Sequence, residues 1–121
     1  MAAYRRDLAP FLAFLAAHAV PRCPACGGSL CAQRLQWLER QLAQSDAPTV
    51  IALHHPPFAT GIGHMDGMGL QDPAALARTV RRFPQVQRVI AGHVHRSIQT
   101  LFAGTIASTC PSPAHQIALD L

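Results

Sequence analysis

The chain has 121 residues, enough for at most one ordinary domain. Half of the residues are hydrophobic and 13% are charged, a globular composition that excludes a disordered chain. Every basic residue other than histidine is an arginine, and these arginines are scattered without interleaved aromatic residues, which argues against nucleic acid as the main partner.

The N-terminal segment loosely imitates a signal peptide. Arg5 and Arg6 precede an apolar stretch over residues 8–20, but Asp7 stands at its entrance and Pro10 inside it. An amphipathic or buried helix is the simpler interpretation, and export is the weaker one. No apolar stretch reaches the roughly 20 residues that span a bilayer. We therefore expect a cytoplasmic protein without a membrane partner.

Four cysteines leave three alternatives open. Cys23 and Cys26 are spaced like one knuckle of a zinc ribbon, but only Cys31 follows nearby, and Cys110 is far along the chain. The sequence favours incidental reduced thiols over a structural zinc site, and a redox pair is the weakest interpretation.

Regular elements are predicted from residue 30 onward. Leucines at helical spacing predict a helix over residues 30–44, and Pro48 follows its end. The unbroken apolar run over 49–53 predicts a strand that is covered on both faces. A loop rich in Gly and Pro occupies residues 54–69.

A second helix and a second strand follow this loop. Asp72 and Pro73 are typical of a helix start, and Pro84 ends the helix. Residues 86–90 form the next predicted strand. Short strands are then expected near residues 97–102, 105–108 and 116–121.

Histidines follow both of the longer predicted strands. Strands that alternate with helices predict a parallel sheet, and ligands gather at the carboxyl ends of such strands. His54 follows the first strand, and His93 and His95 follow the second. In extended backbone, His93 and His95 project to the same side, and we expect Gly92 to let the chain turn there. Neutral imidazole is the commonest protein metal ligand, so these residues predict a metal site.

Two motifs give this site a family resemblance. The stretches His54-His55-Pro56-Pro57 and Gly92-His93-Val94-His95-Arg96 resemble the two C-terminal motifs of the calcineurin-like metallophosphoesterases. The nearest branch resembles class III cyclic-nucleotide phosphodiesterases and related glycerophosphodiesterases. The resemblance covers roughly residues 27–121, with residues 1–26 an unmatched lead-in. It implies an α/β fold: the C-terminal half of a metallophosphoesterase-type α/β sandwich, with a βαβ unit followed by short antiparallel strands.

The resemblance also implies a two-metal hydrolase of small phosphodiesters. His54 and His93 correspond to ligands of one ion and His95 to a ligand of the other, and Fe, Mn and Zn all suit such donors. His55, His64, Asp66 and Arg96 correspond to positions on the substrate side or next to the ligands. A solvated loop is the alternative for His64 and Asp66, and a surface cation beside the strand is the alternative for Arg96. His55 is expected to line the pocket without binding the ion directly.

The acidic motifs of the family are missing from this chain. It contains no Asp-x-His, Gly-Asp or Gly-Asn-His sequence. We expect an incomplete domain that is poorly active alone, and a frameshift, a misplaced start or a partner in trans remain open as reasons. The alternative function is a non-catalytic module that binds a metal or a partner and uses Cys23 and Cys26 as a zinc clip. As for oligomeric state, a homodimer remains one of the open possibilities.

Overall fold

The computed structural model describes residues 30–117. Their regular elements are, in chain order, α2 (Ala32–Leu42), β1 (Thr49–Leu53), α3 (Gly63–Asp66), α4 (Pro73–Arg82), β2 (Val86–Ala91), β3 (Ile98–Phe102) and β4 (Thr105–Thr109). The predicted helix over residues 8–20 and the pair Cys23 and Cys26 lie outside the described residues.

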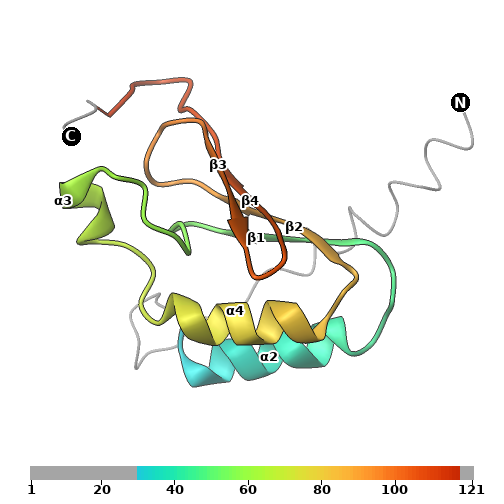
Figure 1. Ribbon diagram of the computed structural model, residues 1–121. Helices are drawn as coiled ribbons and strands as arrows, with labels where there is room; N and C mark the ends of the chain where they lie inside the picture. Colours follow the sequence, from blue (N-terminus) through green and yellow to red (C-terminus); the bar gives the residue numbers. More distant parts are fainter. Residues whose placement is uncertain (1–29, 118–121) are drawn as a thin grey trace, which may run out of the picture.

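The four strands form one mixed sheet in the order β1-β2-β4-β3 (Figure 1). Strand β1 runs parallel to β2, and β2 runs parallel to β4, whereas β3 and β4 form an antiparallel pair. The β1–α4–β2 unit is therefore followed by short antiparallel strands. This arrangement confirms the fold class predicted from the sequence.

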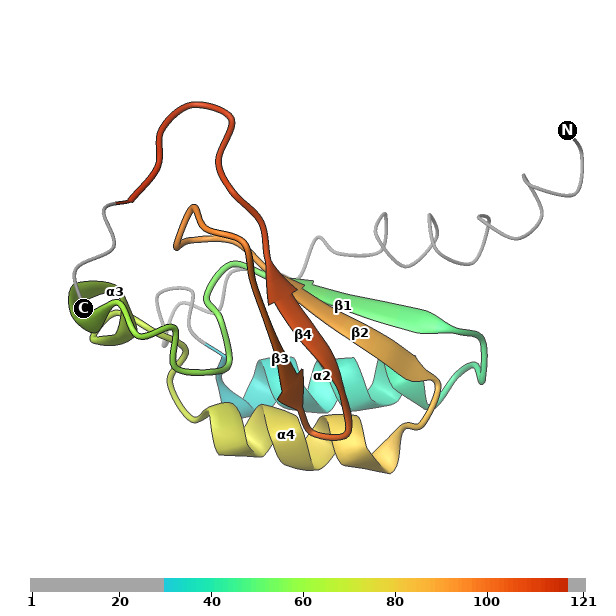
Figure 2. The same cartoon turned by 45° about the horizontal axis from the view of Figure 1, so that its top comes forward.

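Helices α2 and α4 lie on the same face of the sheet (Figure 2). Their apolar stripes pack on the strand side chains that point toward them, because helical and strand periodicities each place apolar residues on one side. The buried residues of this main cluster are Leu38, Leu42, Ile51, Leu76, Val80, Val86, Val89 and Ala107.

The opposite face of the sheet is less well covered by the described residues. Pairing places Val50 beside Arg88, Ala52 beside Ile90 and Leu101 beside Ile106 on this face. Leu101 is 81% exposed and Ile106 is 38% exposed. The expectation that both faces of the first strand are covered is therefore wrong for residues 30–117, because α2 and α4 pack on one side only.

Local capping chemistry sets the start of α4. The Asp72 carboxylate accepts a hydrogen bond from the Ala75 amide at 3.0 Å, and Pro73 begins α4, as predicted. Helix α2 is shorter at both ends than the predicted range 30–44. The short helix α3 was not predicted. Gln116 and Ile117 belong to no strand, so the last predicted strand is absent as far as the description extends.

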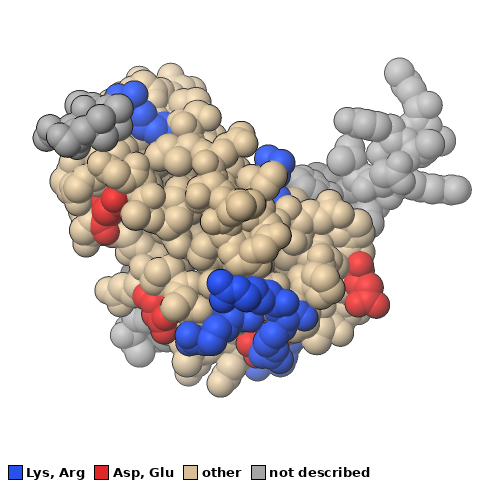
Figure 3. All heavy atoms as spheres, viewed as in Figure 1, with Lys and Arg blue, Asp and Glu red and all other residues tan. Residues whose placement is uncertain are grey.

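Charged residues gather on the helical side of the molecule. Arg78, Arg81 and Arg82 are exposed on α4, and Arg82 forms an ion pair with Glu39 of α2 at 2.8 Å. Figure 3 shows basic side chains clustered over this part of the surface. Within residues 30–117, every helix is too short or too polar to cross a bilayer.

Candidate metal centre

The carboxyl ends of β1 and β2 are held side by side. Leu53 pairs with Ala91 at the end of the parallel ladder, and the Gly92 amide donates a hydrogen bond to the His54 carbonyl at 3.0 Å. The residues that follow the two strands therefore start from neighbouring positions. Strand pairing alone brings the two histidine motifs together, as the sequence predicts.

Three imidazoles meet at these strand ends. His54, His55 and His93 each offer one nitrogen, and the three atoms lie within 4.8 Å of one another. Nδ1 of His93 is 3.2 Å from Nε2 of His54, and the ring centres of His55 and His93 are 4.5 Å apart. His54 is exposed, whereas His55 and His93 are half-buried. The cluster is thus open to solvent on one side.

The Gly92–His95 segment is a tight turn and not an extended strand. β2 ends at Ala91, His93 has a φ of 70° and His95 a φ of 52°, and the Val94 amide donates to the Gly92 carbonyl at 2.8 Å. Left-handed backbone is uncommon for residues with a Cβ and often marks functional sites. The predicted extended arrangement of His93 and His95 is therefore wrong.

Val94 explains why this turn forms. It is only 1% exposed and packs with Ile62 and Met65 in a second small apolar cluster, with Ile98 and Ile117 at its border. Burial of Val94 fixes the backbone on both sides of it. The imidazole of His93 consequently lies with those of His54 and His55, whereas that of His95 lies beside His115.

His95 lies beside His115 and outside the three-histidine group. The His95 and His115 ring centres are 4.4 Å apart, and Nδ1 of His95 is buried without a hydrogen-bond partner. The structure thus brings together two of the three predicted ligands, His54 and His93, and adds His55 to them. The proximity of His115 to His95 is not signalled by any motif in the sequence.

Gly92 has no special conformational role in this turn. Its φ is not positive, and a Cβ built on it would meet His54 Nδ1 and the His54 carbonyl oxygen at 3.8 Å, an ordinary contact. The expectation that Gly92 is needed for the turn is therefore wrong. The positive φ values fall on the two histidines that follow it.

Thr109 and Arg96 brace the turn from the C-terminal side. The buried Thr109 hydroxyl donates to the Arg96 carbonyl at 2.6 Å and accepts from the Ile98 amide at 3.1 Å. The Arg96 guanidinium donates to the Ile117 carbonyl at 2.7 Å. Arg96 thus ties down the segment that carries His115, and Thr109 is a supporting residue that sequence reasoning missed.

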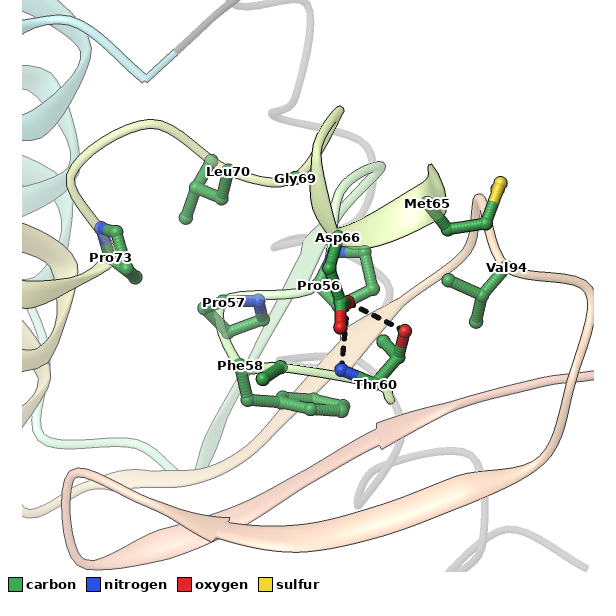
Figure 4. A pocket seen from close by; sticks show the side chains of 11 residues that line it. Pro56, Pro57, Phe58, Thr60, Met65, Asp66, Gly69, Leu70, Pro73 and Val94 are labelled. Carbon is green, nitrogen blue, oxygen red and sulfur yellow. Dashed lines mark hydrogen bonds between the residues drawn. The ribbon is translucent and has the colours of Figure 1, made fainter. Parts of the chain in front are cut away.

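Asp66 organises its own loop. Its carboxylate accepts hydrogen bonds from the Thr60 amide at 2.8 Å, the Thr60 hydroxyl at 2.6 Å and the Gly61 amide at 3.0 Å. Figure 4 shows Asp66 directed at Thr60 beside a cavity of about 190 Å³. Burial raises the pKa of Asp66, but the hydrogen bonds together lower it below its ordinary value. His64 is exposed on α3.

Two imidazoles of the cluster are biased toward the neutral form. Burial, followed by the charge of His54, lowers the pKa of His55. Burial is also the main cause for His93, where His55, His54 and His95 lower the pKa further. Both shifts favour the neutral imidazole, which is the form that donates a lone pair to a metal.

The donor atoms fit a transition-metal ion. No carboxylate of the described residues joins the three imidazoles, so the donor set consists of nitrogen atoms. Neutral nitrogens suit zinc and similar borderline ions, whereas calcium and magnesium prefer oxygen. An apolar cavity of about 320 Å³ adjoins the cluster, and His54, His55, Trp37 and Leu70 are among its lining residues.

Imidazoles at the ends of parallel strands, with helices on one face, define an α/β fold with a candidate metal site. The model of the family described as calcineurin-like phosphoesterase matches residues 15–97, which is more than half of the chain. The chain therefore belongs to the calcineurin-like phosphoesterase family. Because this match begins at residue 15 and the structural description at residue 30, a division of the chain at residue 26 stays a prediction.

Several curated and solved proteins are similar to this chain. A probable glycerophosphodiester phosphodiesterase from Arcobacter nitrofigilis is 44% identical over 96 residues, covering 78% of this chain and 35% of the relative. A probable cyclic nucleotide phosphodiesterase from Rhodopseudomonas palustris is 38% identical, with the same coverage. The crystal structure of a dimetal phosphatase from Danio rerio matches 65% of this chain and 26% of that one, at 25% identity and a TM-score of 0.56. The chain thus spans about a third of the length of these curated relatives.

Proposed function

We propose that this chain supplies the histidine-bearing part of a metal-dependent phosphodiesterase centre. The observation that carries the proposal is the convergence of His54, His55 and His93 at adjacent strand ends in a chain of this family. The names of the relatives support a small phosphodiester substrate, either a cyclic nucleotide or a glycerophosphodiester.

In the complete centre, His54 and His93 bind one ion and His95 contributes to a second. Fe, Mn and Zn are the candidate metals. A divalent ion supplies Lewis-acid chemistry, which draws electron density from a phosphoryl oxygen and eases ionisation of the attacking water. The imidazoles contribute neutral donors, and the carboxylates that balance two ions come from outside this chain.

The remaining predicted residues take supporting roles in this proposal. His64 is exposed on α3, where it can meet a substrate, and Asp66 fixes the segment that precedes this helix through Thr60. Arg96 holds the segment that carries His115. The cytoplasmic location and the homodimer stay predictions, and no observation favours the zinc-clip alternative with Cys23 and Cys26.

A chimera tests the proposed function. Residues 30–117 replace the matching segment of the Arcobacter relative, and hydrolysis of a chromogenic phosphodiester and of cyclic AMP is measured with Mn²⁺. Activity well above background is expected. Substitution of His54, His93 or His95 by Ala should reduce it by more than the roughly 10–100-fold that loss of a ligand's supporting partner costs. Arg78→Ala on the exposed side of α4 is the matched control and should leave it unchanged.

The 121-residue chain by itself should show activity near background. Robust turnover by the isolated chain that His54→Ala abolishes would contradict the need for outside carboxylates. A well-folded chimera without activity would contradict the phosphodiesterase proposal itself.

A further inference from the structure

We propose that this chain, by itself, binds one transition-metal ion through three imidazoles, those of His54, His55 and His93, with His95 left uncoordinated. The inference rests on the proposed function only in taking His54 and His93 as ligands. It assigns a ligand role to His55, for which the sequence predicts a place in the pocket wall, and it sets the stoichiometry at one ion per chain.

The spacing of the nitrogens fits a single ion. In a tetrahedral site with metal–nitrogen bonds of about 2.0–2.1 Å, two ligand nitrogens lie roughly 3.3–3.4 Å apart. Nδ1 of His93 and Nε2 of His54 are already 3.2 Å apart. One nitrogen from each of His54, His55 and His93 lies within 4.8 Å of the other two. A shift of little more than about 1 Å would therefore bring all three nitrogens to the spacing of a tetrahedral site.

His55 is better placed than His95 to complete this set. The His55 ring centre is 4.8 Å from that of His54 and 4.5 Å from that of His93. His95 lies beyond the buried Val94, and its ring packs against His115. His95 is absent from the set of nitrogens that lie within 4.8 Å of one another, and Val94 and Thr109 both hold the turn that carries it.

The charge of the cluster also favours one ion. Three imidazoles contribute no negative charge, and none of the acidic residues among 30–117 joins them. Two dications roughly 3.5–4 Å apart need an anion between them, whereas a single dication with three neutral nitrogens and a water molecule is a known type of zinc site. The exposed side of His54 leaves room for that fourth ligand.

Metal titration of the purified chain tests this assignment. Cys23→Ser and Cys26→Ser are introduced throughout, so that the paired thiols do not compete for the ion. Calorimetry with Zn²⁺ and the visible spectrum of bound Co²⁺ then report stoichiometry and coordination without any activity measurement. We expect one ion per chain and a Co²⁺ spectrum of the four-coordinate type.

Variants identify the ligands. His55→Ala should weaken Zn²⁺ binding at least 10–100-fold, as should His54→Ala and His93→Ala. His115→Ala is the matched control, and His95→Ala is the variant that distinguishes His55 from His95 as the third ligand in the isolated chain; both should change the affinity less than about threefold. Wild-type affinity in His55→Ala, or a loss in His95→Ala as large as that in His55→Ala, would overturn the proposal.

X-ray absorption of the Zn²⁺-loaded parent chain provides a test that is independent of how the variants fold. Three imidazole neighbours are expected around each ion, and two or fewer would overturn the assignment. This result is separable from the proposed function. An inactive chimera with a three-imidazole ion in the chain contradicts only the phosphodiesterase, and an active chimera with a two-imidazole ion contradicts only the assignment of His55.

Discussion

The helix-covered face of the sheet and the strand-end turn differ in what fixes their structure. On the covered face, Leu76 and Val89 belong to a cluster built from two helices and three strands. At the strand ends, Val94 anchors a turn with only a few apolar neighbours, and the Thr109 hydroxyl supports it by donating to the Arg96 carbonyl and accepting from the Ile98 amide. The comparison indicates that global stability depends on the first region, whereas the positions of the imidazoles depend on the second.

The largest effect is expected in the main cluster. Leu76 is 1% exposed at the centre of the contact between α4 and the sheet. Leu76→Ala should lower the free energy of unfolding by about 2–5 kcal/mol, because it removes buried methyl groups and leaves a cavity. Urea denaturation measures the change.

Leu101→Ala is the matched control for this substitution. Leu101 is 81% exposed on the less covered face of the sheet, so its truncation should change the unfolding free energy by less than about 0.5 kcal/mol. Equal losses in the two variants would show that the second face is also packed in solution.

A pair of valines separates stability from site geometry. Val89 is 0% exposed in the main cluster, and Val94 is 1% exposed between the two histidines of the turn. Replacement of either by Ala should cost about 1–3 kcal/mol of folding free energy. Only Val94→Ala should also weaken Zn²⁺ binding, because only Val94 fixes the backbone beside His93. Urea denaturation and calorimetry on both variants give the two quantities.

The valine comparison fails if both variants bind Zn²⁺ with the parent affinity. In that case, the turn keeps its left-handed residues without the Val94 side chain. The burial of Val94 would then be a consequence of the turn and not its cause.

The sequence predicted the regions whose structure is decided locally. The strand over 49–53 and the cap at Asp72 follow from an apolar run and from capping chemistry, and both are confirmed. The turn at His93 was missed because its backbone depends on Val94 packing against Ile62 and Met65, which lie at and in α3, about thirty residues earlier in the chain. Sequence spacing alone favoured an extended pair of histidines.

The composition of the histidine cluster was likewise only partly predictable. His54 and His93 meet because their strands pair, which the motif order implies. His55 follows His54 directly, and neighbouring residues of an extended chain point to opposite sides, so its approach to His93 was not expected. The chain bends immediately after β1, and this bend brings the second imidazole into the group.

Acidification should destabilise the metal-free chain through the same histidines. The pKa values of His55 and His93 are lowered in the folded state, mainly by burial, so the unfolded chain binds more protons below its ordinary imidazole pKa of about 6.5. The stability that these residues contribute is present above that pH and is lost as the pH falls through the folded pKa values. Urea denaturation in chelator at pH 7.5, 6.5 and 5.5 measures this loss.

A double variant isolates the two imidazoles in this measurement. With His55→Gln and His93→Gln, the dependence on pH between 7.5 and 5.5 should be shallower than in the parent chain. The same slope in both proteins would assign the loss to other groups.

The smallest effect is expected at Asp66, which supports the loop next to the strand-end turn without entering the main cluster. Its pKa lies below the ordinary value of about 3.9 because the Thr60 and Gly61 hydrogen bonds outweigh the effect of burial. The Asp66 carboxylate therefore stabilises the folded chain above about pH 4, and this contribution disappears as the pH falls through the pKa of Asp66 in the folded state. Asp66→Asn should cost about 1 kcal/mol or less at pH 7, since solvent weakens the charged hydrogen bonds at this half-buried position. Urea denaturation at pH 7 and pH 3 should show a loss in the variant at the higher pH only, and an equal loss at both would mean that the carboxylate charge does not contribute.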